Sequence, residues 1–371
     1  MQTSISGGGS VGKITEILNS LDCKRCLLVC DSAFDFLGIK DLLYKDNLHF
    51  VRFSDFTPNP VYEDVVKGVE VLRKENCEGI VAIGGGSAID VAKCIKLFSN
   101  LYHSENYLQE NWQDSGIPFI AVPTTAGTGS ESTKFAVIYK DGIKQSINHK
   151  SIIPSFAILD PDLLKNLPLY QKKCTLLDAL CQGIESWWSV KSTAESQKYS
   201  KNAVKLIIKN YKAYIFENSS SAAEKIMEAS NLAGRAINIA ETTAPHAMSY
   251  KMTSLYNLPH GHAVALGLPF VLEYMLSHKH LCIDPRGEEH LTAVFNDIAN
   301  CLGRRNPYEA VAFLKEMLKE LHINPPQIPE SELKTLCNSV NPTRLKNNPV
   351  ALSAEAIYSI YKQIGGITND S

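Results

Sequence analysis

Residues 79–98, GIVAIGGGSAIDVAKCIKLF, predict a strand, a glycine turn and a helix that follow one another without interruption. Glycines at the end of a strand let the backbone approach a pyrophosphate, and the free N–H groups and dipole of the following helix favour its negative charge. The turn, Gly84-Gly85-Gly86-Ser87, is therefore a candidate dinucleotide-binding loop. Because it lacks the GxGxxG spacing, a tight corner without a ligand is the alternative interpretation.

Strand-like and helix-like segments alternate on both sides of this loop. Residues 61–75 have apolar side chains at helical spacing. The other strand-like runs are CLLVC (26–30), LHFVRF (48–53), PFIAVP (118–123), FAVIY (135–139) and FAILD (156–160). This alternation predicts an α/β fold with a mostly parallel sheet covered by helices on both faces.

The pattern changes after Pro161, where strand-like runs stop and long amphipathic stretches such as 195–216 and 307–322 follow. We therefore expect an α/β domain over residues 1–162 and an all-α domain over residues 163–371. There are no internal repeats and no low-complexity linker.

The composition is that of an ordinary globular protein. The 371 residues carry a net charge of -2, with 44% hydrophobic and 20% charged residues. This charge argues against nucleic-acid binding and against a basic membrane-binding surface. The N-terminal MQTSISGGGSVGK lacks the apolar core of a signal peptide, and no run approaches a membrane span. We expect a cytoplasmic protein.

Ten cysteines include a CxxC at Cys23 and Cys26, with Cys30 four residues further on. No second CxxC accompanies it, and the run from Cys26 to Cys30 has the pattern of a buried strand. We therefore interpret the cysteines as small buried apolar residues rather than as a redox motif or zinc site.

A second polar loop, PTTAGTGSE at residues 123–131, also follows a strand. It offers hydroxyls and flexible backbone at the carboxyl edge of the sheet, where open α/β sheets bind ligands. Asp31 follows the first of these strands and could accept hydrogen bonds from an adenosine ribose. A carboxylate there repels a 2′-phosphate, which favours NAD(H) over NADP(H). A plain turn or helix-capping role for Asp31 is the alternative.

The second half contains candidate metal ligands. Asp178 and Gln182 lie four residues apart, and so on one face of a predicted helix, while His246 lies in TTAPHAMSY and His260 and His262 lie in LPHGHAVA. A carboxylate with two neutral imidazoles can hold Fe(II) or Zn(II) with open positions for a carbonyl oxygen. The alternative is a capping aspartate, a surface glutamine and scattered core histidines.

The order of these motifs resembles that of the iron-dependent alcohol dehydrogenase family, which is related to glycerol dehydrogenase and dehydroquinate synthase. The matching motifs are PNP (58–60), GGGSAID, PTTAGTGSE, Asp160-Pro161, LDALCQGIES, PHAMSY, LPHGHA and Asn341-Pro342. They span nearly the whole chain. The resemblance implies a Rossmann-like dinucleotide-binding domain, a helical domain of the dehydroquinate synthase type, and a metal in the cleft between them.

The resemblance also implies individual roles. Asp31 would lie near the adenosine ribose, and Gly85, Gly86 and Ser87 would hold the pyrophosphate. The remainder of the cofactor groove would be lined by Asn59, Thr124, Thr125, Thr128 and Lys144. The metal ligands would include Asp178, His246 and His260, which match three of the four that the family uses.

Two positions depart from the family pattern. The fourth ligand is usually a histidine, but here it is Gln182, whose amide oxygen is a weaker donor, so we expect loose metal binding or a water in its place. The histidine often found four residues after His246 is Tyr250. A phenol has a pKa of about 10, so it needs a nearby metal or cation to act as an acid near neutral pH. Tyr250, His262 and a bound water are the candidate proton donors, and simple packing is the alternative for Tyr250.

The substrate is indicated by Lys134 and by four residues upstream of His246. A cation with nearby hydroxyls suits an anionic headgroup such as a phosphonate or sulfonate, although solvated surface charges are the alternative. The four residues are Arg235, Asn238, Thr242 and Thr243. Together with DALCQ, this segment resembles the branch of the family labelled phosphonoacetaldehyde reductase.

We therefore predict a metal-dependent, NAD(H)-linked alcohol dehydrogenase or aldehyde reductase, with phosphonoacetaldehyde reduction to 2-hydroxyethylphosphonate favoured. Sulfoacetaldehyde and generic short-chain aldehydes are alternative substrates. Two other classes stay open: a dehydroquinate synthase-like lyase that returns its NAD, and a binding protein without metal. The resemblance also implies a homodimer or larger homo-oligomer.

Overall fold

The computed structural model describes residues 2–44, 48–102 and 106–366. The chain divides into two compact units. The first comprises Met1–Leu167 with Asn218–Gly234, and the second comprises Pro168–Glu217 with Arg235–Ser371. Helix α7 (Ser220–Ala240) contributes to both units, a feature that the simple change of pattern after residue 162 does not reveal.

Among the described residues, the first unit contains one six-stranded sheet in which every neighbouring pair is parallel, as predicted. Its order is β1 (Thr3–Ser6), β8 (Phe156–Leu159), β5 (Phe119–Pro123), β4 (Gly79–Gly84), β2 (Arg25–Val29) and β3 (His49–Phe53). Strand β1 was not expected, because TSIS is short and mostly exposed. An edge strand that pairs on one side needs no apolar pattern of its own.

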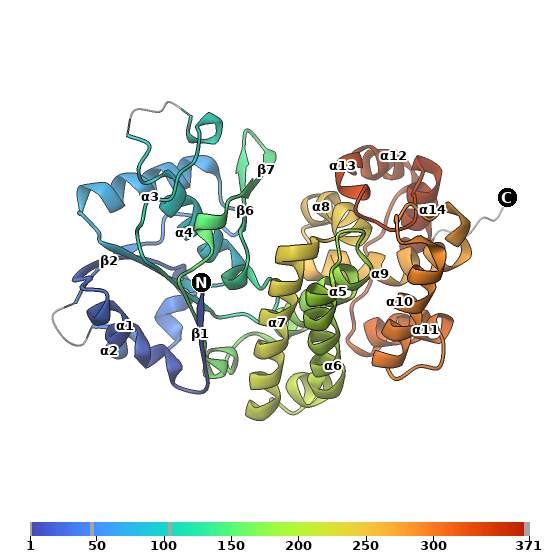
Figure 1. Cartoon of the computed structure of the whole chain (residues 1–371), viewed down its shortest axis with the longest axis horizontal. Coiled ribbons are helices and arrows are strands. Elements are labelled where there is room, and N and C mark those ends of the chain that lie inside the picture. The colour runs from blue at the N-terminus through green and yellow to red at the C-terminus, as the bar shows by residue number, and fades with distance from the viewer. Residues whose placement is uncertain (1, 45–47, 103–105, 367–371) are drawn as a thin grey trace. The chain divides into compact units, whose positions relative to one another are not determined.

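Alternate residues of the central strands pack into two apolar layers, because successive side chains point to opposite faces of a sheet. Leu27 and Ile80 pack on one side, in a cluster that includes residues of α3 (Tyr62–Lys74) and α4 (Gly86–Phe98). Leu28 and Val81 pack on the other side, in a cluster with α1 (Ile14–Ser20) and α2 (Lys40–Leu43). Helices therefore cover both faces of this sheet (Figure 1), which confirms the α/β prediction.

The CxxC cysteines belong to the second of these layers. Cys23, Cys26 and Cys30 are buried, and none of them forms a disulfide. Burial raises the pKa of the Cys26 thiol to about 12. A thiol held protonated in this way is a poor nucleophile and a poor metal ligand, in agreement with the structural interpretation.

One predicted strand does not join the main sheet. Strand β6 (Phe135–Lys140) pairs antiparallel with β7 (Ile143–Asn148) in a separate two-stranded sheet. Asp141 and Gly142 connect them with positive φ angles of 52° and 72°. Asp-Gly is a favoured sequence for a two-residue hairpin turn, so the local turn overrides the strand-helix alternation here.

The regular elements described in the second unit are helices, as predicted. They are α5 (Leu169–Trp188), α6 (Ala194–Phe216), α8 (Ala244–Tyr256), α9 (His260–Ser277), α10 (Gly287–Cys301), α11 (Pro307–Glu320), α12 (Glu330–Asn338), α13 (Pro342–Leu345) and α14 (Ala354–Ile364), besides the last turns of α7. Helix α5 packs against α6 and α9, and α9 also packs against α8, α11 and α14 (Figure 1). Helices α5, α8 and α9 are therefore the elements that can share a buried site.

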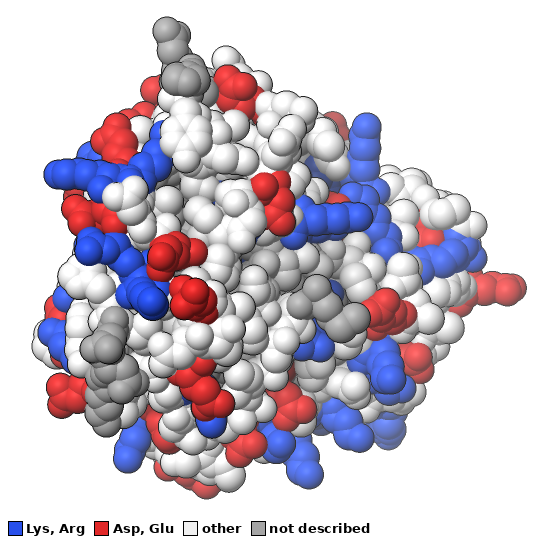
Figure 2. All heavy atoms as spheres, turned by 60° about the vertical axis from the view of Figure 1, so that its left-hand side comes forward, with Lys and Arg blue, Asp and Glu red and all other residues white. Residues whose placement is uncertain are grey.

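The face of the molecule that Figure 2 shows carries charges of both signs. On the face that Figure 2 shows, Lys and Arg side chains are interspersed with Asp and Glu and form no continuous basic stripe. Within the described parts of the chain, no helix has both the length and the apolarity needed to cross a bilayer.

The loop after β5 meets α7 at a contact between two backbones. Gly129, with φ of 58°, lies against Gly234, and a Cβ added to Gly234 would lie 2.5 Å from the Gly129 carbonyl oxygen. Atoms of the main chain cannot move aside as a flexible side chain can. The approach of the PTTAGTGSE loop to α7 therefore requires glycine on both sides.

We expect Gly234→Ala to destabilise the first unit by about 1–3 kcal/mol, because overpacking against fixed backbone forces main-chain shifts. Urea unfolding followed by circular dichroism measures the change. Gly12→Ala is the control, since a Cβ at Gly12 meets nothing within 4 Å. Equal unfolding midpoints for the two variants would contradict the proposed backbone contact.

Candidate metal centre and cofactor site

Three polar side chains share one buried face of α5. Asp178, Gln182 and Glu185 follow one another at spacings of four and three residues, which places them on the same side of a helix. Their exposed fractions are 3%, 3% and 0%. Burial of two acids is costly unless hydrogen-bond donors or cations compensate them.

Two histidines meet this face. His246 lies in the first turn of α8, and His260 is the first residue of α9. One ligand atom from each of Asp178, His246 and His260 lies within 4.8 Å of the other two. The His246 Nε2 atom is 3.4 Å from Asp178 Oδ1, and the two imidazole rings are 5.3 Å apart between centroids. The structure thus brings together the three residues that the sequence singled out.

The beginning of α8 is held by a buried asparagine. Helix α7 ends at Ala240, and Glu241 adopts a left-handed conformation with φ of 59°. The Asn347 side chain donates hydrogen bonds to the carbonyl oxygens of Ala240 and Thr242. The connection between α7 and α8 is therefore fixed, and with it the position of His246.

The beginning of α9 is held by close packing on α5. A Cβ added to Gly261 would collide with the carbonyl oxygen of Cys174 and lie 2.8 Å from the Cβ of Asp178. Only glycine allows the first turn of α9 to approach α5 this closely. The neighbouring His260 is in this way kept beside Asp178.

Glu185 orients His246, a role that the sequence analysis missed. One carboxylate oxygen lies 2.5 Å from His246 Nδ1, and the other accepts hydrogen bonds from the Thr243 amide and hydroxyl at 2.8 and 2.9 Å. Burial opposes the charged form of His246, but Glu185 and Asp178 together raise its pKa to about 9. A carboxylate that accepts from one ring nitrogen leaves the other to face a metal. The available signal was an acid seven residues after Asp178, inside the apolar run LLDALCQGIES.

Two buried oxygen atoms indicate that this site is built for a cation. Asp178 Oδ1 and Gln182 Oε1 have no hydrogen-bond partner within the described residues. A buried acceptor without a donor costs about 1–3 kcal/mol. Burial raises the pKa of Asp178, but the imidazoles of His246 and His260 more than offset this and keep its pKa below the ordinary value. An ionised carboxylate, two imidazoles and an amide oxygen fit a divalent transition metal.

Tyr250 lies beside the third candidate ligand. Its ring stacks on His260 with centroids 5.8 Å apart and an interplanar angle of 5°. The Arg344 Nη1 atom donates a 2.8 Å hydrogen bond to the Tyr250 hydroxyl, and the guanidinium carbon lies 5.0 Å from the ring centroid. The cation that a phenol would need at this position is therefore Arg344, which the sequence analysis did not identify.

His262, a candidate proton donor, makes hydrogen bonds through both of its ring nitrogens. Its Nε2 is 2.8 Å from the carbonyl oxygen of Asn324, which can only accept, so this nitrogen carries the proton. Its Nδ1 then accepts a 2.8 Å hydrogen bond from the Tyr170 hydroxyl. Burial lowers the pKa of His262 and keeps it neutral. Both ring nitrogens of His262 therefore make hydrogen bonds in this structure, and its role as a proton donor stays a prediction.

The glycine turn lies at a switch point of the sheet. Strand β3 follows β2 on one side, while β4 pairs with β2 on the other side, and ligands of such sheets bind at the carboxyl ends of the strands there. The turn follows β4, and Asp31 follows β2. Gly85 caps α4 without a side-chain hydrogen bond, so the first N–H groups of α4 have no capping side chain. This geometry fits a pyrophosphate.

Several other predicted cofactor residues gather at the turn. The Ser87 hydroxyl donates to the Pro58 carbonyl oxygen, which brings the segment containing Asn59 next to the turn. A Cβ added to Gly86 would lie 2.8 Å from the Thr128 methyl group, and one added to Gly85 would lie 3.6 Å from that of Thr125.

The remaining cofactor candidates are in the same unit. Thr124 donates its amide to the Gly84 carbonyl oxygen at 3.0 Å, and Lys144 lies on β7, opposite Tyr139. Asp31 caps the following turn by accepting a 2.9 Å hydrogen bond from the Ala33 amide. The alternative role of Asp31 as a cap is therefore realised, and its second carboxylate oxygen is not used in that bond.

The predicted substrate residues are divided between the units. Lys134 precedes β6 in the first unit, whereas Arg235, Asn238 and Thr242 belong to the second. The side chain of Lys134 lies over the Phe135 ring at 5.3 Å. The carbonyl oxygen of Thr242 accepts from Asn347 at 2.9 Å, which gives Thr242 a structural contact.

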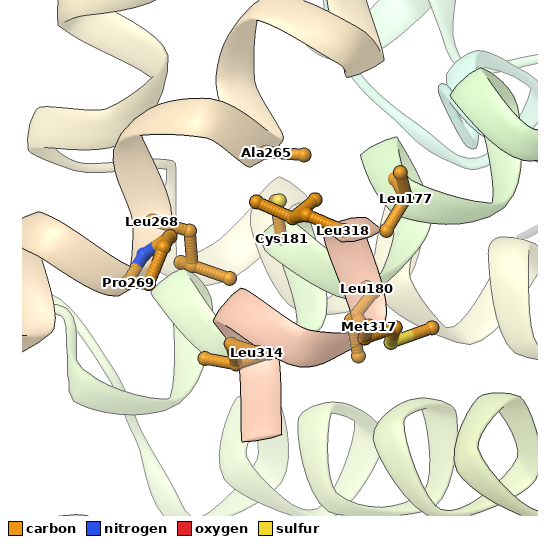
Figure 3. Close-up of a pocket in the computed structure, with 9 residues that line it drawn as sticks. All are labelled: Leu177, Leu180, Cys181, Ala265, Leu268, Pro269, Leu314, Met317 and Leu318. Carbon is orange, nitrogen blue, oxygen red and sulfur yellow. The ribbon is translucent and has the colours of Figure 1, made fainter. Parts of the chain in front are cut away.

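An apolar pocket lies between α5, α9 and α11 (Figure 3). It contains no charged or hydrogen-bonding side chain that could orient a carbonyl or a charged headgroup. Its lining consists of Leu177, Leu180, Cys181, Ala265, Leu268, Pro269, Leu314, Met317 and Leu318. We interpret it as a packing gap, not as the active site.

Replacement of Glu185 by glutamine should weaken metal binding by about 10–100-fold, because the amide cannot provide the charged acceptor that orients His246. Competition of the purified protein with a chromophoric chelator for Zn(II) measures the affinity. Glu217→Gln, at an exposed position, is the control. Unchanged affinity in Glu185→Gln would contradict an orienting role.

Comparison with known proteins covers both units. Residues 2–161 match the family model described as iron-containing alcohol dehydrogenase, and residues 173–365 match the C-terminal model of the Fe-containing alcohol dehydrogenase family. The NAD-dependent methanol dehydrogenase of Bacillus methanolicus is 31% identical over 289 residues, which cover 74% of this chain and 75% of that protein.

Two further similar proteins act on aldehydes with charged headgroups, as their names state. The phosphonoacetaldehyde reductase of Streptomyces viridochromogenes is 32% identical over 304 residues, covering 77% of this chain and 76% of that protein. The crystal structure of sulfoacetaldehyde reductase from Bifidobacterium kashiwanohense in complex with NAD+ has a TM-score of 0.89 and 26% identity, covering 99% of this chain and 98% of that chain.

Proposed function

The chain belongs to the iron-containing alcohol dehydrogenase family and is an oxidoreductase acting on CH–OH groups, and from this premise we propose that it is a metal-dependent, NAD(H)-linked reductase of a small aldehyde. The observation that carries the proposal is the pair of buried oxygens, Asp178 Oδ1 and Gln182 Oε1, without hydrogen-bond partners in the described structure. Asp178 lies beside the two imidazoles, and Gln182 follows it by one turn of α5.

The proposed mechanism divides the work among four groups of residues. Asp178, His246 and His260, together with Gln182, would hold the metal, which when bound supplies Lewis-acid polarisation of the substrate carbonyl. Glu185 keeps the His246 ring in the orientation needed for ligation.

The nicotinamide cofactor, which supplies the hydride, would be held through its pyrophosphate by the first turn of α4 and the glycine turn. The Tyr250 hydroxyl, which accepts a hydrogen bond from Arg344, would deliver the proton to the product oxygen, directly or through a water.

We propose NAD(H) rather than NADP(H) as the cofactor. The Asp31 carboxylate follows β2, where it would repel a 2′-phosphate. Arg52, a nearby cation, donates to the Asp31 carbonyl oxygen at 3.2 Å but binds both carboxylate oxygens of Asp35, at 2.8 and 3.1 Å. Its charge is thus already balanced and does not favour a phosphate.

Phosphonoacetaldehyde is the favoured substrate, with sulfoacetaldehyde and unsubstituted short-chain aldehydes as the alternatives. In support, the proteins similar to this chain include a phosphonoacetaldehyde reductase and a sulfoacetaldehyde reductase. The methanol dehydrogenase has nearly the same identity, so the headgroup has to be decided by assay. A homodimer or larger homo-oligomer is a further part of the proposal.

The function is tested by elemental analysis of the purified protein, followed by an assay of NADH consumption with phosphonoacetaldehyde, sulfoacetaldehyde and propanal. We expect one bound divalent metal per site and net NADH oxidation with at least one aldehyde. Substrate conversion without net NADH change would indicate a lyase of the dehydroquinate synthase type. A protein that binds no metal and reduces no aldehyde would be a binding protein.

Removal of a metal ligand should abolish both metal binding and turnover. We expect Asp178→Ala and His260→Ala to lower kcat/KM by on the order of 10³-fold or more, because the carbonyl is then no longer polarised. Metal content and circular dichroism are measured on the same samples. Asp297→Ala, an exposed acid on α10, is the control. Full activity of metal-free His260→Ala would contradict the mechanism.

A substitution at Gln182 should strengthen metal binding instead of weakening it. We expect Gln182→His to raise the affinity for Zn(II) or Fe(II) by about 10-fold, since imidazole is a better donor than an amide oxygen to these ions. Chelator competition measures the affinity, with Gln182→Ala as the matched comparison. If Gln182→Ala binds metal as tightly as the natural chain, Gln182 is not a ligand.

A further inference from the structure

Arg344 carries a positive charge that forms no ion pair with the acids of the described residues. No carboxylate of the described residues lies within 4.0 Å of its guanidinium, whereas Arg52, Arg286 and Arg305 each pair with one. Its side-chain partner is instead the neutral hydroxyl of Tyr250. A partly buried cation with only a neutral acceptor is a site where an anion gains a charge-assisted hydrogen bond.

The segment that carries Arg344 is fixed on both sides. Asn341 caps α13 by accepting a 2.9 Å hydrogen bond from the Thr343 amide. Three residues after Arg344, the buried Asn347 side chain accepts from the Ser189 hydroxyl and donates to the Ala240 carbonyl oxygen, both at 2.8 Å. These contacts anchor the backbone, so that little additional ordering is needed to bind a ligand.

The Tyr250 side chain lies between Arg344 and the candidate metal ligand His260. The guanidinium bonds to and lies over Tyr250, and the Tyr250 ring stacks on His260. A substrate whose carbonyl oxygen reaches the metal would extend its other end within the region of these side chains. The Arg344 guanidinium is separated from the candidate ligand His260 by one aromatic ring.

We propose that Arg344 binds the anionic headgroup of the substrate and so selects aldehydes that carry a phosphonate, sulfonate or carboxylate. The inference rests on the proposed aldehyde reductase function and adds a specificity residue to it. The N–H groups that Arg344 does not use toward Tyr250 are available for such an oxyanion, and a planar guanidinium can bind two of its oxygens at once. Lys134 and Arg235, which the sequence indicated for this role, are not required by it.

The test compares charged and uncharged aldehydes on the same metal-loaded protein. For Arg344→Gln we expect the ratio of kcat/KM for phosphonoacetaldehyde or sulfoacetaldehyde to that for propanal to fall by about 10–100-fold, the effect of losing a hydrogen bond to a charged group. Arg344→Lys should recover part of this ratio. Lys346→Gln removes an exposed charge from the same segment and should leave the ratio unchanged.

The outcomes separate this inference from the proposed function. If the natural chain reduces no aldehyde, the proposed function fails. If it reduces aldehydes but Arg344→Gln leaves the ratio as it was, only the role of Arg344 is overturned. The separate activities with phosphonoacetaldehyde, sulfoacetaldehyde and succinic semialdehyde identify the headgroup that is preferred.

A measurement without turnover distinguishes binding from a purely structural role. Methylphosphonate, ethanesulfonate and acetate are added to the metal-loaded protein, and thermal unfolding is recorded. We expect at least one of these anions to raise the midpoint of the natural chain and of Lys346→Gln, but not that of Arg344→Gln. An equal shift in all three proteins, or no shift in any of them, would contradict an anion site at Arg344.

Discussion

The second unit depends on the burial of two carboxylates, Asp178 and Glu185, on one face of α5. Taking an ionised carboxylate out of water costs several kcal/mol unless donors or cations replace the water. The Thr243 amide and hydroxyl and the His246 ring provide this for Glu185. Asp178 has the two imidazoles beside it but retains an oxygen without a donor. A divalent ion would satisfy that remaining requirement, and the beginnings of α8 and α9 lie where the histidines can share it.

In the first unit, several close contacts are possible only because glycines leave room for neighbouring atoms. Gly86 leaves room for Thr128, and Gly129 and Gly234 allow a loop to touch a helix through main-chain atoms. These contacts bring the two polar loops together at the end of the sheet where the strand order reverses. The first unit therefore offers N–H groups and hydroxyls to a ligand, whereas the second offers charged and metal-binding side chains.

Gln182 and Tyr250 stand at positions where the resemblance to the family implies histidines. As a fourth ligand, Gln182 would be a weaker donor than histidine, and a tyrosine at position 250 lacks the titration near neutrality of an imidazole. The Arg344 guanidinium places a permanent charge beside Tyr250. The Tyr250 hydroxyl therefore accepts a hydrogen bond from a permanent cation within the second unit.

Much of the architecture was predictable because apolar runs and helical spacing report directly on burial, as for β4 and α4. The short strand β1 and the hairpin turn at Asp141 were not predicted, since neither depends on an apolar pattern. Asp178, His246 and His260 were recognisable from residue types and motif order. The chain alone thus determined the fold class and these three candidate ligands. Only the tertiary structure decided that Glu185 orients His246, that both nitrogens of His262 are occupied, and that Arg344 meets Tyr250 from 94 residues away along the chain. The physical reason is that hydrogen bonds and charges act through space, and the sequence does not state which distant side chains become neighbours.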